Sequence, residues 1–262
     1  MPEVARLPGA RRRRVMITRL IAAFLAAAGL GYLGAAPPPT AHVAPAVPKV
    51  AVASPAATTT PLPSRTPPRH IPPASWTVLP LGDSITLGVG STTGDGYRGP
   101  LLQLAPGITY VGNQGAAPLL HMGLSGWRID QLLAVAPTAL AMYRPAYVLL
   151  HAGTNDTVQG HTSGTMLADM TTLLDAIHAA DPGGMVLLAV IPITPWATSA
   201  QQAQEGAFDD GLPALVAARA RWVVLIDTRD TEIGRDRVHL TDAGYARLAY
   251  LWAAALPDVR TS

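Results

Sequence analysis

The chain has 262 residues, of which 49% are hydrophobic and 14% are charged, and its formal net charge is +2. This length suits one globular domain with additional segments. The lack of cysteine excludes disulfides, thiolate metal sites and a cysteine nucleophile. Residues 1–36 hold six of the 19 basic residues and one of the 17 acids, so the other 13 basic and 16 acidic residues carry a net charge of −3. That remainder is not basic enough to indicate a nucleic-acid partner.

Residues 1–36 have the pattern of a targeting segment. Four arginines, Arg11–Arg14, precede an uncharged run of 17 residues, Leu20–Ala36. A basic stretch before such a run is typical of a signal peptide, and the small residues at its end offer a cleavage site. The run is also just long enough to span a bilayer, so a retained membrane tether through residues 15–36 is the alternative. Either interpretation predicts a secreted or otherwise extracytoplasmic protein.

A linker is predicted over residues 37–75. This stretch contains 12 of the 25 prolines, together with many Ala, Thr and Ser residues and no acids. Such a composition cannot bury enough apolar surface to offset the entropy lost on ordering. We therefore expect a disordered tether biased towards polyproline II, followed by one catalytic domain over residues 76–262.

Short apolar runs alternate with helical stretches from Trp76 onward. The runs predict strands over residues 77–81, 109–112, 147–151, 185–191 and 222–226. The intervening stretches predict helices over residues 97–104, 128–134, 164–180, 201–219 and 242–255. Several runs are nearly continuous Val, Leu and Ile, as expected of strands that are covered on both faces. The alternation predicts a three-layer α/β/α sandwich around a five-stranded parallel sheet.

Ligands bind outside the carboxyl ends of the strands in such sheets, so the residues after each run are the candidates for chemistry. Ser84 follows the first run and Asn155 the third. Gly126 stands in the loop after the second run, where the missing side chain leaves its N–H open. Asp236 and His239 follow the fifth run, at a spacing that lets the carboxylate orient the imidazole.

These five residues supply the parts that acyl transfer needs: a nucleophile, a base with an orienting carboxylate, and N–H donors for an oxyanion. Each part alone is more often a turn or a helix cap, and it is their combination at separate strand ends that indicates an enzyme. No metal or cofactor is required. The other histidines show no metal-ligand spacing; His151 ends the third run, and its role stays open between core packing and support of the site.

Four short segments resemble the four conserved blocks of the SGNH (GDSL) hydrolase superfamily: GDSI (82–85), SGW (125–127), GTND (153–156) and DRVH (236–239). The resemblance implies a flavodoxin-like SGNH hydrolase fold. It also implies that Ser84 is the nucleophile, and that the Ser84 N–H, Gly126 and Asn155 form the oxyanion hole. Asp236 and His239 would complete a Ser-His-Asp triad.

Longer segments are similar to the acetylxylan esterases of carbohydrate esterase family three: LPLGDSITLGVGSTTGDGYR (79–98), LSGWRIDQL (124–132), VLLHAGTND (148–156) and VHLTDAGYARLA (238–249). This similarity implies hydrolysis of a short, acetyl-type ester, small or linked to a polysaccharide. Separately, we expect the protein to be a monomer. The loop over residues 114–122 departs from the family pattern, which leaves sugar specificity open. A lysophospholipase or thioesterase is the alternative, and a non-catalytic carbohydrate-binding module is a more distant one.

Overall fold

The computed structural model describes residues 76–256 of the chain. The predicted signal peptide or anchor and the predicted linker lie outside the described residues, as do residues 257–262. Within residues 76–256, none of the helices combines the length and the apolar character that crossing a membrane requires.

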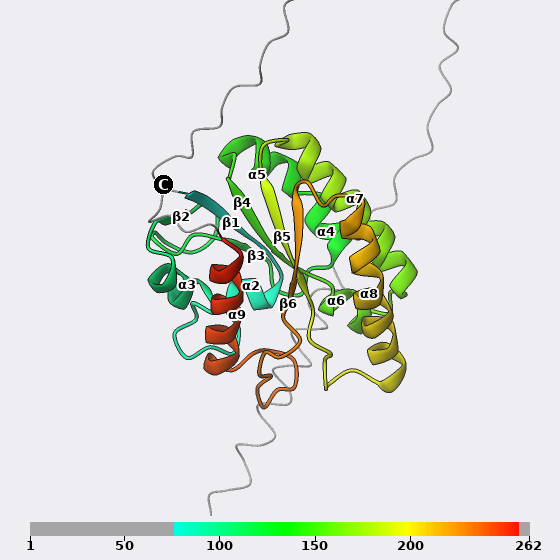
Figure 1. The fold of residues 1–262 in the computed structure, drawn as a ribbon. Coiled ribbons are helices and arrows are strands. Elements are labelled where there is room, and N and C mark those ends of the chain that lie inside the picture. Colours follow the sequence, from blue (N-terminus) through cyan, green and yellow to red (C-terminus); the bar gives the residue numbers. More distant parts are fainter. Residues whose placement is uncertain (1–75, 257–262) are drawn as a thin grey trace, which may run out of the picture. The chain divides into compact units, whose positions relative to one another are not determined.

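The strands of the described domain form one parallel sheet (Figure 1). Its order is β2-β1-β4-β5-β6, and a two-residue strand, β3, also pairs with β1. The strand bounds are β1 Trp76–Gly82, β2 Ile108–Tyr110, β3 Met122–Gly123, β4 Tyr147–His151, β5 Met185–Val190 and β6 Val223–Asp227. The predicted parallel sheet is confirmed, and β3 is an addition to the five predicted strands.

Helices cover both faces of the sheet, as predicted for three layers (Figure 1). One face is covered by α4, α5, α7 and α8, and the other by α3 and α9. Two short helices, α2 and α6, directly follow β1 and β4. The helix bounds are α2 Ser84–Leu87, α3 Arg98–Leu104, α4 Ile129–Leu133, α5 Ala136–Tyr143, α6 Thr154–Val158, α7 Ser163–Ala180, α8 Ser199–Ala217 and α9 Asp242–Ala255.

Alternate side chains of each central strand enter different cores, which explains the continuous apolar runs. Leu79 and Leu81 of β1 pack under α4, α5, α7 and α8. Val78 of the same strand packs with α3 and α9. In β4, Leu150 enters the first core and Leu149 the second. Both faces must therefore be apolar.

The strand order reverses direction at β1. From β1 the chain runs to β2 and β3 on one side, and then crosses to β4 on the other. The connections on the two sides of β1 thus leave in opposite directions. A doubly wound sheet binds its ligand at such a reversal. The segments after β1 and β4 are the ones brought together there.

Gly82, the last residue of β1, permits β1 and β4 to approach closely. A Cβ atom at this position would lie 2.1 Å from the carbonyl oxygen of His151 in β4. It would also lie 2.6 Å from the Thr86 hydroxyl oxygen. Both distances are far below van der Waals contact, so glycine is required here by space.

We predict that Gly82→Ala lowers the free energy of unfolding by at least about 2–3 kcal/mol, since backbone atoms would have to move apart. Chemical denaturation monitored by circular dichroism measures this change. Gly206→Ala is the matched control, because Gly206 lies inside α8 and a Cβ there would meet no atom of the described residues within 4 Å. It should be neutral or stabilise by about 0.5–1 kcal/mol. Equal effects of the two changes would contradict the steric argument.

Two buried acids on α8 hold the segment that follows β5. Asp209 Oδ1 accepts a hydrogen bond from the Ile191 N–H at 3.3 Å. Glu205 accepts from the Thr194 N–H at 2.8 Å and from the Thr194 hydroxyl at 2.7 Å. Burial raises the pKa of Asp209 to about 7, although its hydrogen bond with Ile191 works in the opposite direction. The folded protein therefore keeps a proton on Asp209 at pH values where the unfolded chain has lost it.

This difference makes stability depend on pH. Between about pH 4 and pH 7 the folded state binds more protons at Asp209 than the unfolded state, so this group's contribution falls as the pH rises. Replacing it by Asn removes the titration. The unfolding free energy of Asp209→Asn minus that of the unchanged protein should therefore rise by about 1–3 kcal/mol between pH 4 and pH 7.

Urea unfolding at several pH values measures this gain. Asp210→Asn, at the exposed neighbouring position on α8, is the control and should follow the unchanged protein. A difference between Asp209→Asn and the unchanged protein that stays constant with pH would contradict the assignment.

Candidate active site

Ser84 is the first residue of α2, directly after β1. It is preceded by Asp83, whose side chain caps the helix by accepting a hydrogen bond from the Ile85 N–H at 2.9 Å. Since Ser84 opens the helix, its own N–H has no partner within α2. Ser84 is 6% exposed, so it is almost fully buried.

His239 reaches Ser84 from the loop between β6 and α9, 155 positions further along the chain. Its Nε2 atom lies 2.9 Å from the Ser84 Oγ atom. Its Nδ1 atom lies 2.7 Å from Asp236 Oδ2. Asp236 Oδ1 accepts from the backbone N–H groups of Val238 and His239, at 3.0 and 2.9 Å. The three predicted side chains therefore form one hydrogen-bonded row.

The environment keeps Asp236 ionised. Partial burial raises its pKa, but hydrogen bonds from the Val238 N–H, the His239 ring and the His239 N–H outweigh this, and the pKa lies below its usual value. An ionised Asp236 holds a proton on Nδ1 of the ring. Nε2 is then free to accept a proton from the Ser84 hydroxyl. Such a row can turn a weakly nucleophilic hydroxyl into an attacking group.

Asn155, in α6, joins the loop after β3 to the end of β1. Its Nδ2 atom donates to the Trp127 carbonyl at 2.9 Å. The same atom lies 3.4 Å from Asp83 Oδ2. One N–H of the amide is thus firmly held, whereas the second makes only a long contact with the residue before Ser84.

Gly126 lies one residue before Trp127, in a backbone conformation that favours glycine. Its φ is +81°, and a Cβ there would meet no described atom within 4 Å. Conformation rather than space therefore requires glycine. Its carbonyl accepts from Gln159 Nε2 at 3.0 Å, and Gln159 Oε1 in turn accepts from Arg128 at 2.5 Å. This bridge could not be predicted from the sequence, because a single exposed glutamine forms no recognisable pattern.

Two aspartates next to the predicted site residues are buried and accept hydrogen bonds from backbone N–H groups. Asp83 and Asp156 are both fully buried. Asp156 accepts from the Ile129 N–H at 3.1 Å, which ties α6 to the start of α4. Burial raises the pKa of each to about 7, against a smaller opposing effect from the Ile85 and Ile129 N–H groups. Both carboxyl groups act as acceptors for backbone N–H groups.

Two buried histidines outside this row, His151 and His121, belong to the scaffold. His151 ends β4, is fully buried, and burial lowers its pKa to about 4, so its ring is neutral. Burial also lowers the pKa of His121 to about 4, and its Nδ1 accepts from the Gly123 N–H at 2.9 Å. His121 also closes the 114–122 loop through two backbone hydrogen bonds with Gln114.

One histidine lies beside two acids. His161 Nδ1 is 3.6 Å from Asp156 Oδ1 and 4.0 Å from Asp169 Oδ2. Such a cluster has donor types that metal ions accept. Asp156 is already bonded to the Ile129 N–H, and the geometry is equally that of a histidine between two carboxylates. The spacing of these residues in the sequence does not predict the cluster, because Asp169 lies within α7 and meets the other two only in the fold.

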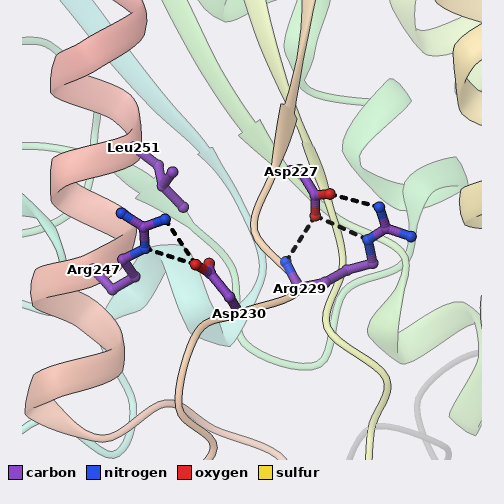
Figure 2. A pocket seen from close by; sticks show the side chains of 5 residues that line it. All are labelled: Asp227, Arg229, Asp230, Arg247 and Leu251. Atoms are coloured by element: carbon purple, nitrogen blue, oxygen red, sulfur yellow. Dashed lines mark hydrogen bonds and ion pairs between the residues drawn. The ribbon is translucent and has the colours of Figure 1, made fainter.

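A hollow on the surface lies away from these residues, between the end of β6 and α9. Figure 2 shows the two ion pairs that line it, Asp227 with Arg229 and Asp230 with Arg247. Leu251 supplies its apolar wall. The carboxylates and guanidinium groups neutralise one another, and none of the five residues is a predicted site residue. The hollow is therefore separate from the Ser84 site.

Known protein families and solved structures match this chain in sequence and in fold. The GDSL-like lipase/acylhydrolase family matches residues 81–247, more than half of the chain. A family 3 carbohydrate esterase of Clostridium thermocellum is 27% identical, with a TM-score of 0.59, over 69% of this chain and 94% of that one. No curated protein sequence matches the chain.

Two further structures share the fold. A family 3 carbohydrate esterase of Talaromyces cellulolyticus has a TM-score of 0.61 at 21% identity, over 71% of this chain and 99% of that one. A carbohydrate acetylesterase of Sinorhizobium meliloti has a TM-score of 0.54 at 21% identity, over 69% and 98%.

The domain thus has the three-layer, parallel-sheet α/β/α fold of the SGNH hydrolases. The chain belongs to the GDSL-like lipase/acylhydrolase family and is a carboxylic ester hydrolase. Among SGNH enzymes it is similar to carbohydrate esterase family three, as the sequence motifs indicated.

Proposed function

We propose that this protein is a serine esterase that removes short acyl groups, chiefly acetyl, from carbohydrates. The observation that carries the proposal is the hydrogen-bonded row from Ser84 through His239 to Asp236. The similarity to a family 3 carbohydrate esterase supports the substrate class. The predicted leader supports action outside the cytoplasm, on a small or polysaccharide-linked ester.

In the proposed first step, Ser84 Oγ attacks the ester carbonyl carbon while His239 Nε2 takes the hydroxyl proton. Asp236 stabilises the imidazolium that forms. The carbon–oxygen bond to the alcohol then breaks, and His239 returns the proton to the departing alcohol. Water attacks the acyl-enzyme with His239 again as base, which releases the acid and restores Ser84.

The developing oxyanion would be held by three donors: the Ser84 N–H, the Gly126 N–H and Asn155 Nδ2. Asn155 suits this role because the Trp127 carbonyl fixes one of its N–H groups. The other makes only the 3.4 Å contact with Asp83, which an oxyanion can replace. Each such donor is worth roughly 2.7–4 kcal/mol in an acyl-transfer site.

Replacing Ser84 by Ala should lower the turnover of p-nitrophenyl acetate by at least about a thousandfold, since within residues 76–256 no other hydroxyl is bonded to the His239 ring. Initial rates measured spectrophotometrically test this. Ser199→Ala, at an exposed serine that opens α8, is the matched control and should retain activity. A Ser84→Ala protein that keeps near-normal turnover, or still reacts with a fluorophosphonate, would overturn the nucleophile assignment.

Acyl and alcohol preference test the substrate class. We expect kcat/KM for p-nitrophenyl acetate to exceed that for the octanoate by at least about tenfold. We also expect acetate release from acetylated xylan or acetylated glucomannan, measured beside acetylated peptidoglycan. A preference for long acyl chains or thioesters would indicate a lipid or thioester hydrolase instead. Binding to a polysaccharide with no turnover of any ester would indicate a carbohydrate-binding module.

A further inference from the structure

The loop between β5 and α8, residues 191–198, is held rigidly beside the proposed site. The Thr194 N–H and hydroxyl both bond to the fully buried Glu205 carboxylate. The Thr194 carbonyl accepts from Gln202 Nε2 at 3.1 Å and from the Ala197 N–H at 3.0 Å. The turn over residues 194–197 is thus fixed from inside by α8.

The same turn is bonded to the loop that carries Asp236 and His239. The Trp196 N–H donates to the Arg237 carbonyl at 3.1 Å, and the Arg237 guanidinium donates to the Pro195 carbonyl. Arg237 has a φ of +66°, which non-glycine residues adopt rarely. Two positions separate it from His239, at most about 7 Å of chain.

Trp196 is the exposed tryptophan of the domain. All five tryptophans of the chain lie within the described residues, and Trp196 has 46% of its surface exposed. Trp76 and Trp252 are buried, and Trp127 and Trp222 pack against the first core. Ile193, on the same loop, is 38% exposed. A fixed loop therefore holds apolar surface in water beside the site.

The proposed reaction determines which part of the substrate would lie beside the Trp196 loop. The leaving oxygen must come within hydrogen-bond distance of His239 Nε2 to receive its proton. The alcohol portion is therefore on the His239 side of Ser84, the side to which the Trp196 loop is bonded. A rigid, exposed indole offers a large flat surface with little conformational entropy to lose.

We propose that Trp196 is a specificity-determining residue, whose indole packs against the C–H face of the pyranose ring that bears the ester. This inference rests on the proposed carbohydrate esterase function and adds a residue that selects the alcohol. A small aliphatic alcohol is too short to cover the indole, whereas a sugar ring can cover it.

The test compares kcat/KM for an acetylated xylo-oligosaccharide with that for ethyl acetate, both by acetate release. In Trp196→Ala the ratio of the two values should fall about 5–20-fold, mainly through KM for the oligosaccharide, and Trp196→Phe should restore part of it. Tyr250→Ala is the matched control, because Tyr250 is an exposed aromatic residue on α9 well away from the α9 N-terminus. It should leave the ratio unchanged.

Two other outcomes would contradict either the role of Trp196 or the proposed substrate class. If both activities of Trp196→Ala fall equally, or neither falls, Trp196 does not select the alcohol, and the carbohydrate esterase proposal stands. If the unchanged protein hydrolyses ethyl acetate but not the oligosaccharide, the proposed substrate class is wrong and the role of Trp196 is overturned with it.

Discussion

The hydrogen bond between Ser84 Oγ and His239 Nε2 is the contact on which the proposed chemistry depends. It joins the start of α2 to the loop before α9, across 155 positions of sequence. Neither side chain is positioned by its own segment alone. The parallel sheet brings both segments to the same edge, and Asp236, bonded to two backbone N–H groups as well as to the ring, fixes the imidazole there.

The loops around this contact are held by buried acids. Asp83 caps α2, Asp156 holds the start of α4, and Glu205 and Asp209 hold the segment after β5. Each carboxyl accepts hydrogen bonds from backbone N–H groups that would otherwise be buried without partners. Burial raises the pKa of all four above its usual range, so these acids serve rigidity at some cost in stability towards neutral pH.

Much of the fold and the members of the site could be predicted from the sequence. The continuous apolar runs reveal strands covered on both faces, and α9 has the predicted bounds, Asp242–Ala255. Two residues of β3 are too few to form a pattern, and α2 and α6 are too short to show helical periodicity. Nothing in the sequence shows that Trp196 is exposed whereas Trp127 packs against the core, because burial depends on the layer that each loop faces. The Gln159 bridge to Gly126 likewise depends on tertiary contact.

The distance in sequence between Ser84 and His239 also concerns the order in which the molecule is completed. During synthesis, β1 and α2 emerge long before the loop that carries the imidazole. A chain that still lacks that loop contains Ser84 but has no base to activate its hydroxyl. On the proposed mechanism, ester turnover therefore begins when the last strand and helix dock. Activity is then a direct measure of how many molecules have finished folding.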